Sequence, residues 1–383
     1  MSRPTTTMGE PHVTGHMTEI SEADVLQALQ GVEDPELHKD FVELGMIRDV
    51  KASGGVISLS VILTTPACPL KDEIGNRIRS ALLERIPRVV AVNIDFGAQV
   101  MAFRGIGDKA PIAGVKNVIA VGAGKGGVGK STVAVNLALA LKNSGASTGL
   151  VDADVYGPNV PTMMGASGTP YGENNKIMPL EAHGIKLMSI GFLLPSDKPV
   201  IWRGPMIAGT LKQFLYDVNW GELDYLVVDL PPGTGDAPLT LVQSIPITGA
   251  LLVTTPQDVA IEDVTKAASM FTTLSVRVLG VVENMSYFLC PHCGDRTDVF
   301  DSGGGARLAE KLGVPFMGEI PLDPRLRMGG GPGIPLMAAD PDSSLGQVFN
   351  KVAETVAGRV SVASMEAIGA LPFKPGPGFQ PIG

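Results

Sequence analysis

Residues 124–132 read GKGGVGKST, and this stretch decides the fold. The apolar run at 117–121 before it predicts a strand, and the pattern at 131–143 after it predicts a helix. In this setting the glycines let backbone N–H groups curl around phosphate oxygens, and the helix N-terminus adds a favourable dipole. The match to G-x-x-x-x-G-K-[ST] between a strand and a helix therefore predicts a nucleotide-binding P-loop.

The lysine and the hydroxyl at the end of this loop have distinct expected roles. Lys130 is expected to meet the β- and γ-phosphates, and Ser131 is expected to bind Mg²⁺ through a hard oxygen ligand. The candidate nucleotide-binding residues of the loop are Gly124, Lys125, Gly126, Gly127, Val128, Gly129, Lys130, Ser131 and Thr132.

Acidic residues end two further predicted strands. The strand at 148–152 ends in Asp152, with Asp154 two residues later, and the strand at 225–229 ends in Asp229. Ligands of doubly wound sheets bind at the carboxyl ends of the strands, so these carboxylates are expected beside the P-loop. Asp229 is expected to hold Mg²⁺ directly or through water, and Asp152 is expected to support the metal.

The wider pattern predicts an α/β fold, with a mostly parallel P-loop NTPase sheet, helices on both faces and a small α+β domain before it. From about residue 118, apolar strands alternate with helices, as in right-handed βαβ crossovers. The preceding part reads as helix, loop, two strands, helix and strand. The expected boundaries are a disordered leader at 1–18, the small domain at 19–102, a Gly- and Pro-rich linker at 103–115, the ATPase domain at 116–360 and a disordered tail at 361–383.

Composition narrows the class of protein further. The 383 residues carry a formal net charge of −9, which argues against broad electrostatic binding to nucleic acid or to an anionic membrane. The sequence has no apolar run near the roughly 20 residues that a bilayer span requires. Three cysteines are too few for a disulfide framework, so we expect a reducing, cytoplasmic location without membrane or nucleic-acid partners.

The sequence Cys290-Pro-His-Cys293 raises a separate question, because a closed tetrahedral zinc site needs four ligands. One reading is a redox dithiol, although such motifs start a helix in a thioredoxin unit and here a strand precedes the cysteines. A second is a zinc knuckle that uses His292 and still lacks a ligand. In a third, a two-fold axis joins two copies of the motif, and four thiolates suit either zinc or a 4Fe–4S cluster.

The lysine at the second position of the loop makes the motif more specific. KGGVGKST resembles the deviant Walker A loop of the family that includes MinD-type, ParA-type and nitrogenase iron proteins. The resemblance implies a homodimer in which Lys125 reaches the partner's nucleotide. It also implies that Asp154 orients the attacking water and that Asn284 reads the adenine edge, which favours ATP. Lys125, Lys130 and Asp154 are therefore the candidate catalytic residues.

From about 115 to 345, the order KGGVGKST, DADVYGPN, WRGPM, VVDLPPGTGD, TTPQ, NMS and CPHC resembles the Mrp/ApbC-type iron–sulfur cluster carriers. DPEL at 34–37 and LTTPACPLKD at 63–72 resemble the small iron–sulfur assembly domain found in bacterial members. The resemblance implies an ATP hydrolase that binds a 4Fe–4S cluster at Cys290 and Cys293 of two chains. It further implies transfer of the cluster to apo iron–sulfur proteins, with cluster-assembly scaffold proteins as further candidate partners.

Two alternative functions are considered besides this interpretation, and two further residues have alternative roles. A membrane- or DNA-positioning ATPase needs a basic amphipathic helix or a basic face, which an acidic chain with a Pro/Gly-rich tail does not suggest. Electron transfer like that of nitrogenase iron protein is disfavoured, because cluster cysteines in that family are widely separated. Cys68 is either a transient cluster ligand or a small buried residue, and Arg203 is either a phosphate sensor or an interface residue.

Overall fold

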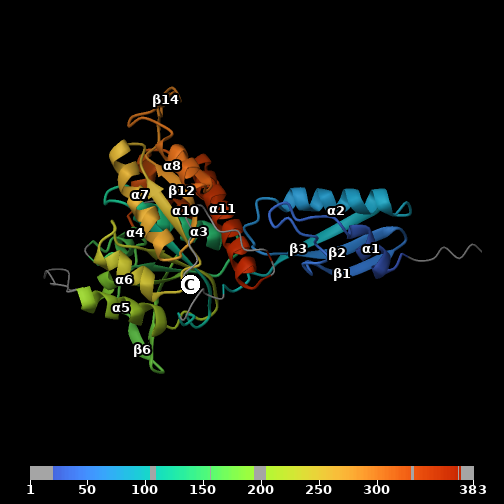
Figure 1. The fold of residues 1–383 in the computed structure, drawn as a ribbon, viewed down its shortest axis with the longest axis horizontal. Coiled ribbons are helices and arrows are strands. Elements are labelled where there is room, and N and C mark those ends of the chain that lie inside the picture. Colours follow the sequence, from blue (N-terminus) through green and yellow to red (C-terminus); the bar gives the residue numbers. More distant parts are fainter. Residues whose placement is uncertain are drawn as a thin grey trace, which may run out of the picture. The chain divides into compact units, whose positions relative to one another are not determined.

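The computed structural model describes residues 20–103, 109–155, 157–193, 204–328, 332–369 and 371. The predicted leader at 1–18, part of the predicted linker and Arg203 lie outside the described residues. The chain divides into two compact units (Figure 1). Of the described residues, one unit contains 20–62 together with 72–97, and the other contains 63–71 and those from 98 onward.

The first unit is a three-stranded sheet with two helices. Its elements are α1 (Glu22–Leu29), β1 (Ile47–Ser53), β2 (Val56–Leu63), α2 (Lys71–Arg85) and β3 (Ala91–Ala98), with strand order β1-β2-β3. Ser21 caps α1 in a reciprocal capping box with Asp24, which satisfies two backbone N–H groups. Every second residue of β2 is buried, as expected for a strand with one face on the core. This small α+β arrangement confirms the predicted fold class of the N-terminal part.

The second unit contains an eight-stranded sheet within the described residues. Neighbouring strands are parallel except at one edge, where β8 runs antiparallel to β9. In spatial order the strands are β15 (Phe316–Ile320), β12 (Val278–Asn284), β11 (Gly249–Thr254), β4 (Val115–Ala123), β10 (Leu223–Asp229), β5 (Thr148–Asp152), β9 (Ile185–Ser189) and β8 (Leu180–Ala182). The strand before the P-loop, β4, therefore lies in the interior of the sheet. The parallel pairing of most strands confirms the predicted, mostly parallel sheet.

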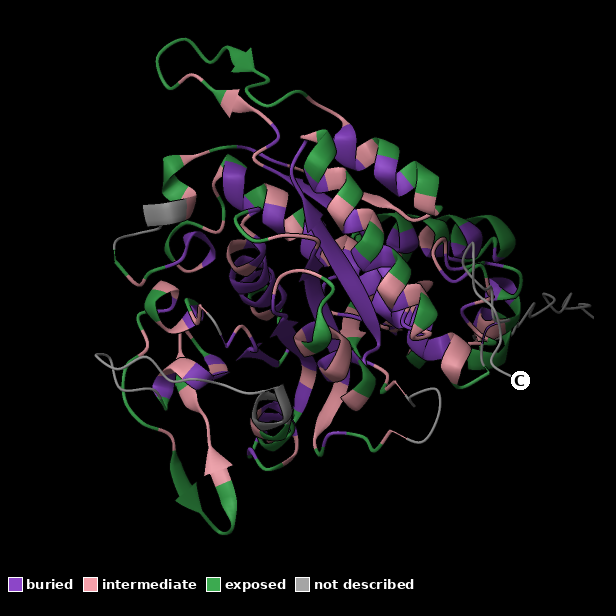
Figure 2. Cartoon of the chain, turned by 60° about the vertical axis from the view of Figure 1, so that its left-hand side comes forward, coloured by how far each residue is buried: buried purple, intermediate pink, exposed green. Residues whose placement is uncertain are grey.

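Helices cover both faces of this sheet, as predicted. Successive residues of β4 point to opposite faces, so Ile119 and Val121 belong to one core while Val118 and Ala120 belong to the other. The first core is closed by α3 (Lys130–Asn143), α10 (Leu336–Ala339) and α11 (Ser344–Ala367). The second is closed by α5 (Gly204–Tyr216), α6 (Asp236–Ser244), α7 (Asp258–Thr273) and α8 (Gly304–Leu312). Figure 2 shows the buried central strands between helices whose outer sides are exposed.

Short elements complete the unit. They are α4 (Val160–Met163), β6 (Tyr171–Glu173), β7 (Lys176–Met178), the 3₁₀ turn Ile190–Phe192, β13 (Phe288–Leu289), β14 (Arg296–Thr297) and α9 (Pro324–Met328).

Two expected boundaries differ from the structure. The prediction of disorder from residue 361 is wrong for 361–367, because α11 continues to Ala367. Ser364 is buried there and its hydroxyl donates to Asn117 Oδ1 at 2.8 Å. Residues 63–71, expected in the small domain, group with the second unit. In that segment Thr65 is buried and accepts a hydrogen bond from the hydroxyl of Tyr225 at 3.0 Å.

Candidate nucleotide site and cysteine hairpin

The P-loop joins β4 to α3, and its glycines are required by its backbone. Gly127 and Gly129 have φ of 82° and 81°, in the left-handed region that favours glycine. A Cβ on Gly129 would lie 2.1 Å from Asn284 Nδ2, and one on Gly124 would lie 2.1 Å from the backbone of Asp263. Nothing lies within 4 Å of a Cβ added to Gly126. The loop thus packs against α7 and β12 on one side and leaves open space on the other.

Because an added Cβ would clash at Gly129 and meet nothing at Gly126, these two positions allow a matched pair of substitutions. Gly129→Ala is expected to lower the free energy of unfolding by at least about 1–2 kcal/mol, the usual cost of a left-handed residue, because the Asn284 contact adds a clash. Gly126→Ala is expected to leave the unfolding transition in urea near that of the parent and to weaken nucleotide binding. Urea denaturation without nucleotide and titration with ADP measure the two effects. Equal stability of both variants would contradict this account of the loop.

Lys130 and Asp229 form a buried ion pair at the carboxyl edge of the sheet. Lys130 Nζ lies 2.5 Å from Asp229 Oδ1, and the two residues are 6% and 0% exposed. Asp229 is paired in register with Asp152 on the adjacent strand β5. Ser131, the next residue of α3, has its hydroxyl 3.5 Å from Lys130 Nζ. The structure therefore brings together Lys130, Ser131, Asp152 and Asp229 of the predicted site.

The environment raises the pKa of both carboxyl groups. Burial, and then the charge of Asp229, raise the pKa of Asp152 to about 7. Burial also raises the pKa of Asp229, against the opposing effect of the Lys130 ammonium, and the charge of Asp154 raises it further. Two carboxyl groups at one sheet edge repel each other, so a cation in the site would relieve both.

The donor set fits a magnesium ion. Asp229 Oδ2 is buried and has no hydrogen-bond partner among the described residues. Mg²⁺ takes oxygen ligands, usually one or two carboxylates with waters and phosphate oxygens. The Asp229 carboxylate and the Ser131 hydroxyl are oxygen donors of this kind, and a bound ion would give the orphaned oxygen a partner.

Ser189 was not predicted from the sequence, yet it orients Asp152. Its hydroxyl donates to Asp152 Oδ2 at 3.0 Å, and the Asp154 N–H donates to Asp152 Oδ1 at 3.2 Å. Ser189 ends β9 and is paired in register with Asp152. The position could not be recognised from sequence because β9 itself was not predicted.

Three remaining candidates lie around the loop. Asn284 ends β12 and is buried, and its Nδ2 donates to the carbonyl of Val128 at 2.8 Å, so in this structure the amide contacts the P-loop backbone. Lys125 and Asp154 are half-buried. The segment after β10 also contacts the loop, since the Gly233 N–H donates to the Ala123 carbonyl at 3.0 Å.

Cys290 and Cys293 lie in a tight turn between β13 and β14. The Cys290 N–H donates to the Asp295 carbonyl, and the Gly294 N–H donates to the Cys290 carbonyl at 2.8 Å. Cys290 is half-buried and Cys293 is exposed. Hydrogen bonds from the N–H groups of Cys293 and His292 hold the pKa of the Cys290 thiol below its ordinary value, while the Cys293 thiol donates to Asp295 Oδ2 at 3.2 Å. The turn thus carries one half-buried and one exposed sulfur, and the lowered pKa of Cys290 favours its thiolate form.

The hairpin that carries this turn holds a partly exposed ion pair with β15 and several exposed apolar side chains. Arg296 lies over the ring of Tyr287 at 4.2 Å and pairs with Glu319 at 2.9 Å. Leu289, Val299 and Phe300 are 48%, 47% and 38% exposed. Across the described residues, no group of three or more His, Cys, Asp or Glu side chains is placed to hold a metal ion. Any metal held by four protein ligands at this turn therefore needs ligands beyond those that the described part of one chain gathers.

Cys68 lies three residues before α2, which begins at Lys71. It is half-buried in the segment that groups with the second unit.

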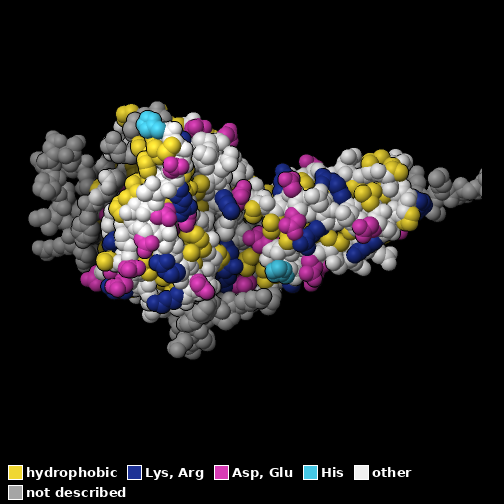
Figure 3. All heavy atoms as spheres, turned by 90° about the horizontal axis from the view of Figure 1, so that it is seen from above, with side chains coloured by type: hydrophobic (Ala, Val, Ile, Leu, Met, Phe, Trp, Pro, Cys, Tyr) yellow, Lys and Arg dark blue, Asp and Glu magenta, His cyan; other side chains and the backbone are white. Residues whose placement is uncertain are grey.

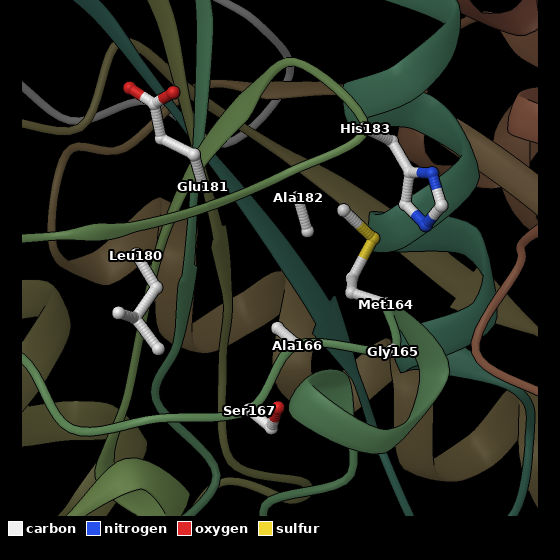
Figure 4. A pocket seen from close by; sticks show the side chains of 8 residues that line it. All are labelled: Met164, Gly165, Ala166, Ser167, Leu180, Glu181, Ala182 and His183. Carbon is white, nitrogen blue, oxygen red and sulfur yellow. The ribbon is translucent and has the colours of Figure 1, made fainter.

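A shallow pocket of about 310 Å³ lies beside β8 (Figure 4). It is lined by residues 164–167 and 180–183, with His183 and Met164 at one end. It contains none of the predicted nucleotide or cluster residues.

On the face shown in Figure 3, Lys and Arg side chains are interspersed with Asp and Glu. Among the described helices, none is both long and apolar enough to cross a membrane.

The parallel sheet, the loop after β4 and the carboxylates that end β5 and β10 define a P-loop nucleotide-binding protein. Two family models match the chain: residues 114–357 match the NUBPL iron-transfer P-loop NTPases, and residues 22–94 match the iron–sulfur cluster assembly proteins.

Similar proteins narrow the class. The iron–sulfur cluster carrier protein of Synechocystis sp. is 50% identical over 349 residues, covering 89% of this chain and 98% of that protein. The carrier protein of Deinococcus radiodurans is 50% identical over 346 residues, covering 90% and 97%. A solved nucleotide-binding protein from Archaeoglobus fulgidus, in complex with ADP, is 38% identical, with 69% of this chain and 95% of that chain covered and a TM-score of 0.52. This chain belongs to the iron–sulfur cluster carrier protein family, which confirms the resemblance found in the sequence.

Proposed function

We propose that this chain is an ATP hydrolase that holds a 4Fe–4S cluster between two copies of itself and transfers the cluster to apo iron–sulfur proteins. The observation that carries the proposal is the exposed turn with its two sulfurs. Cys290 and Cys293 supply half of the four thiolates that such a cluster takes, and the exposure of Cys293 beside the half-buried Cys290 leaves room for a second turn. A cargo held at an accessible site can also leave it, as a carrier requires.

The nucleotide site is proposed to bind ATP with Mg²⁺. Lys130 would contact the β- and γ-phosphates, and Ser131 and Asp229 would hold the metal, with Asp152 supporting it. A phosphate that binds Lys130 competes with Asp229 for the ammonium. Mg²⁺ supplies Asp229 with a replacement partner, so nucleotide and metal are expected to bind together. Asp154 is proposed to orient the attacking water, and Asn284 to read the adenine edge.

The homodimer is proposed to couple the two sites. Lys125 belongs to the same loop as Lys130 and is half-exposed, and it is proposed to contact a nucleotide held by a second copy. The apolar side chains around the hairpin, Leu289, Val299 and Phe300, would be covered by the same contact. Clients are apo iron–sulfur proteins, and assembly scaffolds are proposed as the source of the cluster.

Anaerobic loading of the purified chain with iron and sulfide tests this function. We expect a broad visible absorption band and recovery of cluster by an apo-ferredoxin acceptor, faster with Mg·ATP than without. Uptake of zinc alone, with no acid-labile sulfide after loading, would overturn the cluster assignment.

A further inference from the structure

Glu283, the next-to-last residue of β12, has a buried carboxylate that the nucleotide and cysteine sites leave unexplained. The residue is 0% exposed. A carboxylate in such a place is unfavourable unless hydrogen bonds compensate for the lost water. Its partners therefore indicate what it does.

Three groups donate to this carboxylate. The Ser286 hydroxyl donates to Oε1 at 2.5 Å, the Gly303 N–H donates to Oε1 at 3.3 Å, and the Gly305 N–H donates to Oε2 at 2.5 Å. Gly303 is the N-cap of α8. Helix N-termini carry unpaired N–H groups and attract anions, so Glu283 serves as the cap that α8 does not obtain from its own N-cap residue.

These partners lie at the two ends of the segment that joins β12 to α8. Ser286 lies two residues after the end of β12, and Gly303 and Gly305 lie where the chain enters α8. Between them are β13, the cysteine turn and β14. The outgoing end is also held to β15, since the Ser286 N–H donates to the Ile320 carbonyl at 3.0 Å. Glu283 thus closes the base of the hairpin that carries Cys290 and Cys293.

The residue after Glu283 contacts the nucleotide loop. Asn284 donates to the Val128 carbonyl, and Gly129 leaves no room for a Cβ beside the Asn284 amide. Met285 then turns the chain through a left-handed backbone with φ of 53°. Two consecutive residues of one strand therefore contact the P-loop and the base of the cysteine hairpin.

We propose that Glu283 is a positioning residue that makes the cysteine hairpin move with the end of β12, and so transmits the nucleotide state to the cluster ligands. This inference rests on the proposed function. A change in the P-loop on nucleotide binding displaces Asn284, and the carboxylate clasp carries that displacement to both ends of the hairpin. Without the clasp the hairpin keeps its cysteines but is no longer tied to β12.

Glu283→Gln tests the coupling in the full-length, cluster-loaded chain. Glutamine keeps the size of the side chain but turns an NH₂ donor toward backbone N–H groups that need an acceptor. The measured quantity is the rate of cluster transfer to apo-ferredoxin, with and without saturating Mg·ATP. We expect the parent's rate to change roughly fivefold or more with Mg·ATP, and that ratio to fall close to one in Glu283→Gln. Iron content and ATP affinity should stay within about twofold of the parent.

Glu319→Gln is the matched control. Glu319 is paired in register with Glu283 on the neighbouring strand, but its carboxylate meets the partly exposed Arg296. Surface pairs of this kind contribute little, so this variant should keep the parent's ratio.

The outcomes separate the two proposals. A Glu283→Gln variant that retains the parent's Mg·ATP ratio overturns this inference and leaves the proposed function in place. If the parent's rate of cluster transfer does not change with Mg·ATP, the ATP-dependent function itself is overturned. If Glu283→Gln does not fold, Ser286→Ala removes one arm of the clasp and is expected to reduce the ratio. An unchanged ratio in that variant then counts against the clasp.

Discussion

Cys290→Ala is expected to reduce cluster-bound iron to background after anaerobic loading. In a homodimer the substitution removes two of four thiolates at once, and a 4Fe–4S cluster held by the remaining two is not retained through desalting. The visible absorption band should disappear with the iron and the acid-labile sulfide. Cys293→Ala is expected to behave in the same way, because its exposed sulfur completes the half-site.

Cys68→Ala is the control for the loss of a thiol as such. Cys68 lies outside the hairpin and should leave the iron content of the purified, loaded chain near that of the parent. If Cys290→Ala bound as much iron and sulfide as the parent, the hairpin would not be the cluster site.

Lys130→Gln is expected to lower steady-state ATP turnover by about 100-fold or more, the usual loss when a charge-stabilising group is removed from a transition state. The same substitution leaves Asp229 buried without its cation. Breaking a buried ion pair on one side costs up to about 3–5 kcal/mol, so the free energy of unfolding should fall as well. Phosphate release at saturating ATP and urea denaturation measure the two effects separately.

Lys125→Gln is the matched comparison within the same loop. Lys125 is half-buried where Lys130 is buried, so its loss should leave stability near that of the parent while turnover still falls. Unchanged turnover in Lys130→Gln would remove the P-loop from the proposed mechanism.

The sequence predicted the sheet around the P-loop well, because long apolar strands with glycine loops between them leave few alternatives. Thr148–Asp152 was predicted to the residue, and α3 began within one residue of expectation. The edge strands β8 and β15, and β9 next to β8, were not predicted. They are short, and their place depends on pairing with strands that are distant in the sequence. Ser189 was missed with them.

The candidate site, too, could be predicted only where a motif or a strand end marks a residue in the sequence. Lys130 and Asp229 could be assigned to one site in advance, because a motif predicted the first and a strand end predicted the second. The role of Glu283 could not be predicted, because a charged residue next to Asn284 only indicates the end of a strand in the sequence. Its role depends on the Gly303 and Gly305 amides, which lie 20 and 22 residues later. The continuation of α11 past residue 360 was missed because the Pro/Gly-rich tail lies so close to it.

Native mass spectrometry of the anaerobically loaded chain, with iron and sulfide counted on each species, tests the central claim most directly. The account predicts that intact cluster, about four irons with four sulfides, occurs on a species of two chains, while single chains carry no complete cluster. A single chain that carries a full 4Fe–4S cluster through Cys290 and Cys293 would contradict it.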